Sequence, residues 1–173
     1  AIWGSVPPRN PNFTGRTELL AQVHERLTGG TTAVLPEALH GMGGVGKTQV
    51  VVEFVYLNAS EYDVVWWIPA ERPAQVVASM AELAQKLRLP VKAEAAAVPA
   101  VKEALRVGVP YARWLLVFDN ADTPDDVRQY FPLGGPGHIL VTSRNPQWSS
   151  VAKAVEVDVF RREESQALLT RRA

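Results

Sequence analysis

The spacing of apolar residues divides this chain into helices and short buried strands. Apolar residues at positions i, i+3, i+4 and i+7 predict amphipathic helices, and the segments that fit a helix are Leu19–Leu27, Lys47–Asn58, Pro73–Leu87, Ala100–Arg106, Thr123–Tyr130 and Glu163–Arg172. Short runs rich in β-branched and aromatic residues predict buried strands, one within Thr32–His40 and the others over Tyr62–Pro69, Trp114–Phe118, His138–Thr142 and Val155–Val159. Because strands and helices alternate, we expect βαβ units, which form a parallel sheet covered on both faces. The predicted fold class is α/β, with three layers.

The same pattern predicts one domain preceded by an arm. A chain of 173 residues is of ordinary size for one domain. Residues 1–12 are rich in proline and polar residues and are interpreted as an arm or linker, and residues 13–173 as the domain. Residues 89–99 are rich in Ala, Val and Pro and are predicted to form a loop. The last helical pattern has no stop signal, so we expect a fragment of a longer multidomain protein.

Composition disfavours several classes of protein. Basic and acidic residues number 18 each, and a formal net charge of 0 disfavours nucleic-acid binding, which usually goes with a basic excess. No apolar run approaches the roughly 20 residues that a membrane helix needs, so no membrane partner is expected. The chain has no cysteine, which excludes a disulfide framework and a thiolate metal site. We therefore expect a cytoplasmic protein.

One glycine-rich segment has the residues for binding phosphate. Residues 41–48 (GMGGVGKT) fit G-x-x-x-x-G-K-[ST] at every fixed position, between a predicted strand and a predicted helix. Glycines let backbone N–H groups point inward at phosphate oxygens, and the start of the helix adds its amides and its dipole. The Lys47 ammonium is expected to reach the β- and γ-phosphates, and the Thr48 hydroxyl to bind Mg²⁺. The predicted nucleotide-binding set in this segment is Gly41, Met42, Gly43, Gly44, Val45, Gly46, Lys47, Thr48 and Gln49.

The same glycines also permit a dinucleotide-binding interpretation. Gly41, Gly43 and Gly46 spell G-x-G-x-x-G, and Glu71 after the next strand could hold a ribose. That interpretation does not require the Lys-Thr pair that follows the last glycine, so a P-loop explains the segment better. A glycine-rich turn that matches by chance is the remaining alternative.

Two further predicted strands end in polar residues. Residues 115–119 (LLVFD) form an apolar run that ends in Asp119, as a Walker B element does, and a carboxylate there would hold Mg²⁺ directly or through water. Another apolar run, residues 139–142, is followed by Ser143 and Arg144. Because ligands bind at the carboxyl ends of parallel strands, we expect these residues to converge on the glycine-rich segment. Arg144 is then a candidate contact for the γ-phosphate, and a plain surface cation is the alternative.

Together these segments resemble the NB-ARC group of STAND signalling NTPases, and they look most like its bacterial branch. The matching segments follow family order over about residues 10–170 and read NFTGRTELLAQVHERL, HGMGGVGKT, YDVVWWIPAE, WLLVFDNAD, HILVTSR and VDVF followed by REESQALL. The resemblance implies a P-loop NTPase sheet of order 2-3-4-1-5, counting the predicted strands along the chain. It also implies that Phe13 and Arg16 contact adenine and that Arg144 senses the γ-phosphate. From the residues alone, Phe13 and Arg16 could equally cap and staple the next helix.

Two departures from the family pattern bear on activity. The residue after the Walker B aspartate is often acidic in this family and polarises the attacking water, whereas here it is Asn120. An amide can orient water but cannot take a proton, so hydrolysis is predicted to be slow or negligible, with Asp122 as a candidate substitute. The sequence also stops before the helical and winged-helix subdomains that close over the nucleotide in the family. We therefore expect a more open site and a lower affinity.

The favoured hypothesis is an ATP/ADP-binding switch domain of a bacterial STAND-type regulator, in which the nucleotide controls conformation and self-association. Its expected ligands are ATP or ADP with Mg²⁺, and its expected partners are further domains of the parent chain and other copies of it. The residues assigned to catalysis are Lys47, Asn120 and Arg144. One alternative is an active P-loop ATPase or small-molecule kinase, and another is a degenerate scaffold, against which the intact Lys47, Thr48 and Asp119 argue.

Overall fold

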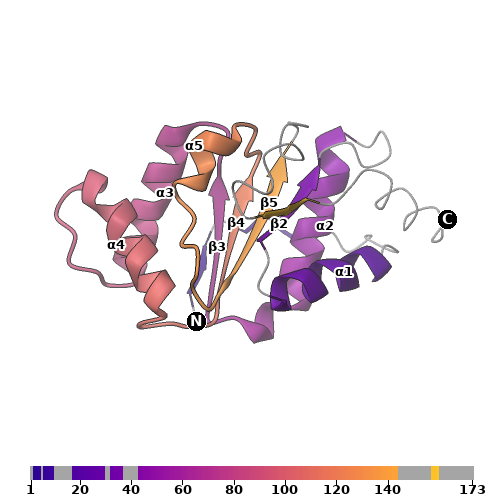
Figure 1. Cartoon of the computed structure of the whole chain (residues 1–173), viewed down its shortest axis with the longest axis horizontal. Coiled ribbons are helices and arrows are strands. Elements are labelled where there is room, and N and C mark those ends of the chain that lie inside the picture. The colour runs from indigo at the N-terminus through magenta and orange to yellow at the C-terminus, as the bar shows by residue number, and fades with distance from the viewer. Residues whose placement is uncertain are drawn as a thin grey trace.

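The computed structural model describes residues 2–4, 6–9, 17–29, 32–36, 43–143 and 157–159, and along 17–19, 32–36, 43–48 and 157–159 it describes the backbone. This described part is a three-layer α/β structure (Figure 1). Its central layer is a six-stranded sheet of order β1-β3-β4-β5-β2-β6. The strands are β1 (Ile2–Gly4), β2 (Thr32–Pro36), β3 (Val64–Pro69), β4 (Trp114–Asp119), β5 (His138–Ser143) and β6 (Val157–Val159).

Every strand pair in the sheet is parallel, as the sequence predicts. Leaving out β1, the order of the strands agrees with the order implied by the family resemblance. The helix predicted over Glu163–Arg172 lies outside the described residues. The agreement means that the strand ends expected to converge do lie at one edge of the sheet.

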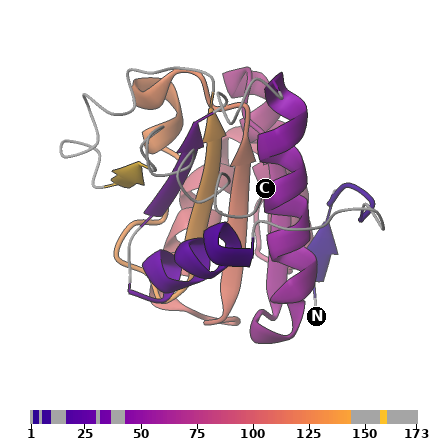
Figure 2. The ribbon, with the colours of Figure 1, turned by 90° about the vertical axis from the view of Figure 1, so that its right-hand side faces the viewer.

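Helices cover both faces of this sheet (Figure 1). They are α1 (Thr17–Thr28), α2 (Gly43–Leu57), α3 (Pro73–Lys86), α4 (Glu94–Val107) and α5 (Pro124–Arg128), with a 3₁₀ turn η1 (Ala59–Glu61) after α2. One hydrophobic cluster lies between the sheet and α3, α4 and α5, and a second lies between the sheet and α1 and α2. Figure 2 shows α1 and α2 on the second face.

The alternation of side chains along the central strands divides the core between the two faces. In β4, Trp114, Leu116 and Phe118 belong to the cluster under α3 and α4. Their neighbours Leu115 and Val117 belong to the cluster under α1 and α2. All five are at most 1% exposed, and burial of a large apolar side chain contributes on the order of 1.5–3 kcal/mol. A strand buried on both faces therefore has the continuous apolar run that identified it in the sequence.

Part of the predicted arm belongs to the sheet. Ile2–Gly4 forms β1, which pairs with β3 through Ile2↔Val64 and Gly4↔Trp66. A Cβ atom on Gly4 would lie 2.1 Å from a ring carbon of Trp66, so the strand needs glycine at this position. A run of three residues beside prolines has no periodicity, which is why the sequence did not reveal this strand.

Helix α4 begins six residues earlier than predicted. It starts at Glu94 and includes Pro99, whereas the sequence analysis placed residues 89–99 in a loop and the helix start at Ala100. Its buried residues Ala97, Val101 and Leu105 recur every four positions and anchor one side of the helix to the core. This packing outweighs the cost of a proline in the helix interior, which is about 3 kcal/mol.

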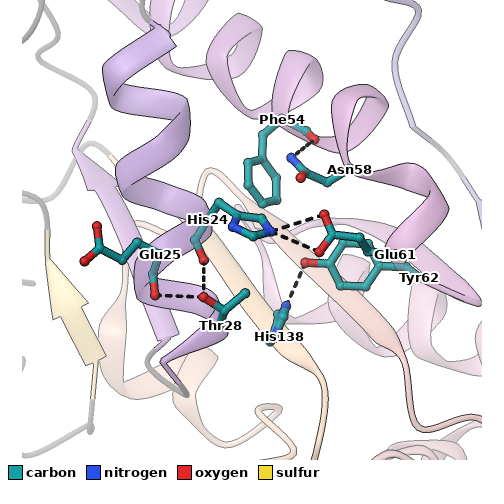
Figure 3. Close-up of polar contacts among 8 residues, drawn as sticks. All are labelled: His24, Glu25, Thr28, Phe54, Asn58, Glu61, Tyr62 and His138. Carbon is teal, nitrogen blue, oxygen red and sulfur yellow. Dashed lines mark hydrogen bonds and ion pairs between the residues drawn. The ribbon is translucent and has the colours of Figure 1, made fainter.

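A polar cluster lies at the amino end of the sheet (Figure 3). The Tyr62 hydroxyl lies 2.7 Å from Nδ1 of His138, and Nε2 of His24 lies 3.0 Å from Oε1 of Glu61. Burial lowers the pKa of His138 and raises the pKa of Tyr62. Both shifts favour the neutral form of the group, so the contact is a hydrogen bond between the tyrosine hydroxyl and the imidazole ring. The cluster joins α1, η1 and the start of β5 at the end of the sheet opposite Asp119.

Replacing Pro99 with Ala tests the start of α4. In the helix interior, the new N–H can donate to the carbonyl of Ala95 and the clash of the proline ring is removed. We expect Pro99→Ala to raise the free energy of unfolding by about 2 kcal/mol, after allowing for the greater freedom of the unfolded chain. Denaturant unfolding followed by circular dichroism measures it.

Pro73→Ala is the matched control, because Pro73 stands at the first position of α3, where proline is favourable. It is expected to lower stability by about 0.5–1 kcal/mol. Equal losses for both substitutions would mean that α4 begins after Pro99.

Candidate functional site

The carboxyl ends of β2, β4 and β5 lie side by side at one edge of the sheet. Pro36, the last residue of β2, pairs with Ser143, the last residue of β5. Phe118 of β4 pairs with Val141 of β5, so the register brings Asp119 beside Thr142. Residues that are more than a hundred positions apart in the chain therefore meet at this edge.

A buried threonine holds the end of β4 in place. The Thr142 hydroxyl donates a hydrogen bond of 2.6 Å to Oδ1 of Asp119, and Oγ1 of Thr142 accepts one of 2.9 Å from the backbone N–H of Asn120. Thr142 is 0% exposed. Its hydroxyl therefore fixes both the rotation of the Asp119 carboxylate and the path of the chain that leaves β4.

The chain turns sharply after Asp119. Asn120 has φ +62°, a left-handed conformation that asparagine tolerates better than most residues. The backbone N–H of Ala121 then donates to the carbonyl of Thr142 at 2.8 Å, and the Ser143 hydroxyl lies 3.4 Å from Oδ1 of Asp122. The turn returns the chain across the end of β5. It places Asn120 and Asp122, the two residues considered for hydrolysis, at the same edge as Asp119.

The glycine-rich segment follows β2 in the chain and includes the start of α2. β2 ends at Pro36, and α2 begins at Gly43. The sequence analysis placed residues 43–46 in a loop and the helix start at Lys47, so the observed start is four residues earlier. Glycine adopts helical and non-helical backbone angles with similar ease, so a run of glycines contains no side-chain signal for the boundary. Gly43, Gly44, Val45, Gly46, Lys47 and Thr48 therefore form the start of α2.

Gln49 in α2 has an acceptor without a partner. Among the side chains that the structure describes, Oε1 of Gln49 is the one buried polar atom with no hydrogen bond. A buried acceptor left unpaired costs about 1–3 kcal/mol. An amide oxygen accepts hydrogen bonds, so this atom suits a bound water or a sugar hydroxyl and does not suit a phosphate oxygen. The binding role of Gln49 stays a prediction.

The donor atoms at this edge fit Mg²⁺. Magnesium prefers a few carboxylate and hydroxyl oxygens together with water and phosphate oxygens. Asp119 supplies a carboxylate whose Oδ1 is held by Thr142, and a carboxylate can accept further interactions beyond this one bond. Thr48, at the start of α2, would supply the hydroxyl.

The structure does not cover all predicted site residues. Phe13, Arg16, Gly41, Met42 and Arg144 lie outside the described residues. The side chains of Lys47 and Thr48 also lie outside them, although their backbone is part of α2. The binding and catalytic roles assigned to these residues stay predictions.

Thr142 is the site residue that the sequence analysis missed. It lies in the segment HILVTSR, which was noted for Arg144 and not for its threonine. The signal available in the sequence is a hydroxyl residue at the end of a strand that neighbours the Walker B strand. That signal becomes specific only when the strand order and register are known.

These features define a class of protein. A parallel α/β sheet, an acid at the end of β4 and a glycine-rich entry into the helix after β2 are the parts of a P-loop NTPase. The model of the NB-ARC domain family matches residues 16–173. The chain therefore belongs to the NB-ARC family.

Two comparisons with individual proteins accompany the family match. A nucleotide-binding leucine-rich repeat (NLR)-like protein of the fungus Hyaloscypha variabilis is 29% identical over 170 residues, covering 82% of this chain and 16% of the fungal protein. This chain thus spans a small part of that relative's length. The solved structure of the Aeropyrum pernix ORC2 protein (ADPNP-ADP complexes) has 14% identity and a TM-score of 0.49, over 87% of this chain and 49% of that one.

Over the residues that the structure describes, none of the helices combines the length and the apolar character needed to cross a bilayer.

Replacing Thr142 with Val tests the role of its hydroxyl. Valine has the same shape but leaves Oδ1 of Asp119 and the N–H of Asn120 without their shared partner. We expect the free energy of unfolding to fall by about 2–4 kcal/mol, as measured by urea denaturation. Thr142→Ser keeps the hydroxyl and should cost about 1 kcal/mol for the lost methyl group. A serine variant as unstable as the valine variant would show that packing, and not the hydrogen bonds, makes Thr142 necessary.

Proposed function

We propose that this chain is an ATP/ADP-binding switch domain of a larger STAND-type signalling protein, with slow hydrolysis. The observation that carries the proposal is the meeting of three elements at one edge of the sheet. The end of β2, which precedes the glycine-rich segment in the chain, pairs with the end of β5, and Thr142 of β5 is bonded to Asp119 of β4. A phosphate-binding segment beside a held carboxylate is the arrangement that binds a nucleoside phosphate with Mg²⁺.

Each part of a nucleotide has a candidate partner. The backbone of residues 41–46 and the Lys47 ammonium would bind the phosphates, and the start of α2 adds a favourable dipole. Thr48 and Asp119 would hold Mg²⁺, which neutralises charge on the phosphates when bound. Phe13 and Arg16 would contact the base, as the family resemblance implies.

Slow hydrolysis is supported by the structure around Asn120. Its backbone N–H is held by the bond to Thr142, and it directly follows Asp119, at the position where the family often has an acid. An amide there can orient water, with Arg144 near the γ-phosphate, but it cannot accept the proton. A bound ATP would then persist, which suits a switch better than an enzyme with useful turnover.

The proposed role in signalling is supported by the family match and by the length of the fungal relative. The NLR-like relative is a much longer protein, so we infer that further domains of the parent chain respond to the nucleotide and that self-association depends on it. The bacterial branch and the cytoplasmic location stay predictions, and the relative reported above is fungal. An active ATPase or a small-molecule kinase is the alternative, together with a scaffold that binds no nucleotide.

Binding through Lys47 is tested by Lys47→Ala. Without the ammonium, the phosphates lose their main point charge, and affinity for ATP and ADP should fall at least a hundredfold. Calorimetric titration of nucleotide-free protein with Mg²⁺ measures this, after any co-purified nucleotide has been released by denaturation and identified by chromatography. Lys86→Ala, at an exposed position in the last turn of α3, is the control and should bind as the unmodified protein does. Equal affinities for all three proteins would exclude the assigned site.

Slow hydrolysis is tested by Asn120→Asp. Aspartate also tolerates the left-handed backbone of this position, so the turn is kept while a proton acceptor is added. We expect ATP turnover to rise at least tenfold, measured as phosphate release under saturating ATP and Mg²⁺. Asp122→Asn in the unmodified chain should leave turnover unchanged. If Asn120→Asp does not raise ATP turnover and Asp122→Asn lowers it, the general base is Asp122.

A further inference from the structure

A groove lies between α4 and the chain that leaves α5, two helices on the same face of the sheet (Figure 1). Its volume is about 570 Å³, which is within the range of sites that bind ligands. One wall is a stripe of α4 at helical spacing, and it consists of Pro99, Lys102, Glu103 and Arg106. The opposite wall runs from Arg128 to Leu133. The residues assigned to the nucleotide site do not line this groove.

The charges of the groove favour an anionic ligand. Three cations line it, Lys102, Arg106 and Arg128, and the one carboxylate beside them belongs to Glu103. The acidic residues in the first turn of α5 are not part of the lining. The groove is therefore positively charged in a chain whose formal net charge is 0.

The three cations have capacity left for a ligand. Within the part of the chain that the structure describes, the Arg128 guanidinium makes no hydrogen bond or ion pair. Nζ of Lys102 donates to the carbonyl of Gln129 at 2.5 Å, which leaves two of its three N–H donors. Arg106 pairs with Glu103 at 2.6 Å, but the two side chains are 52% and 61% exposed. An exposed pair of this kind contributes little to stability, so Arg106 can also contact a ligand.

An apolar surface adjoins the groove. Leu133 lines it and is 37% exposed, and Val107 and Val109, just beyond Arg106, are 54% and 65% exposed. A Cβ atom on Gly108 would lie 3.0 Å from the ring of Pro136, so the valines and the chain after Leu133 lie at the same corner. Of the five large apolar side chains that are exposed among the described residues, three are at this corner. Exposed apolar side chains gathered beside a groove are typical of a surface that binds a protein.

The dimensions of the groove fit an extended peptide. The stripe from Pro99 to Arg106 is about 10 Å long along the helix axis, which is enough for about three residues of extended chain at about 3.3 Å each. Lys102 and Arg106 are about 6 Å apart along the axis, close to the spacing of about 6.6 Å between alternate residues of an extended chain. Because alternate side chains point to opposite sides, one set can face α4 while the other faces the wall that contains Leu133.

We propose that this groove is a docking site for an extended acidic peptide segment of a partner protein, in which carboxylates alternate with apolar side chains. The carboxylates pair with Lys102, Arg106 and Arg128, and the apolar side chains contact the opposite wall and the surface around Leu133. Charge complementarity selects the acidic residues, and the exposed apolar corner adds contact area beyond the groove. The inference concerns a surface apart from the nucleotide site and does not depend on nucleotide binding.

The test titrates two peptides into the ¹⁵N-labelled chain and follows its amide resonances by NMR. The acetylated and amidated peptide Leu-Asp-Leu-Asp-Leu has the proposed pattern, and Leu-Asn-Leu-Asn-Leu has the same shape without the charges. The acidic peptide should shift amide resonances along both walls of the groove and bind at least tenfold more tightly than the neutral one. Added salt should weaken its binding, because the cations are accessible to solvent.

Substitutions in the groove separate the contribution of charge from that of apolar contact. Arg128→Ala should weaken the acidic peptide about fivefold, and Arg128→Glu at least tenfold, because the new charge repels the carboxylates. Leu133→Ala should weaken it about threefold through lost apolar contact. Lys86→Ala is the matched control, since it removes one exposed cation from α3 outside the groove and should leave the affinity unchanged. Melting curves verify that each variant keeps the fold.

Several outcomes would overturn the inference. Equal losses in Arg128→Ala and Lys86→Ala would mean a general attraction between charges, and the absence of shifts at millimolar acidic peptide would mean that no docking site exists. If decanoate shifts the groove resonances and the acidic peptide does not, the groove is a site for small amphipathic anions. If the same resonances shift when the chain alone is concentrated, the occupant is a second copy of this chain.

Discussion

Parallel pairing of the strands is the constraint on which this molecule depends. Parallel strands cannot be joined by tight turns, so each connection crosses a face of the sheet, and here the crossings are helices that cover both faces. All strands then point the same way, and their carboxyl ends share one edge. The two hydrophobic clusters stabilise this arrangement from either side of β4, whose side chains alternate between them. A site at the carboxyl edge is a consequence of the fold, and its chemistry depends on which residues end the strands.

Hydrogen bonds between neighbouring strand ends turn this edge into an ordered site. Thr142 is fully buried, and its hydroxyl serves Asp119 and Asn120 at once. A carboxylate near a metal must keep one orientation to bind it well, and a fixed neighbour lowers the entropy lost on binding. The hydrogen bond from the Asn120 N–H to the Thr142 hydroxyl also holds the backbone of Asn120 in its left-handed turn. The proposed metal ligand and the residue proposed to limit hydrolysis are therefore both held by one hydroxyl group on the adjacent strand.

The N-terminal residues that the structure describes, 2–4 and 6–9, are held against the rest of the domain. β1 pairs with β3, Pro7 accepts a hydrogen bond from Tyr56, and Arg9 forms an ion pair with Glu53. Tyr56 and Glu53 both lie on α2, the helix that starts in the glycine-rich segment.

The sequence by itself determined the fold class and the central strands, and it indicated the proposed phosphate-binding segment and the proposed metal-binding acid. These features are local: a buried strand needs a continuous apolar run, and a P-loop needs glycines, lysine and threonine at fixed spacing. Tertiary structure alone decided the partners of Thr142 and Glu53, because a hydroxyl or a carboxylate acquires its partner from strand register or from a segment distant in sequence. It also decided the edge strand β1 and the early start of α4. A three-residue strand forms only against Trp66 of β3, and a helix that includes Pro99 forms because Ala97, Val101 and Leu105 bury their side chains together.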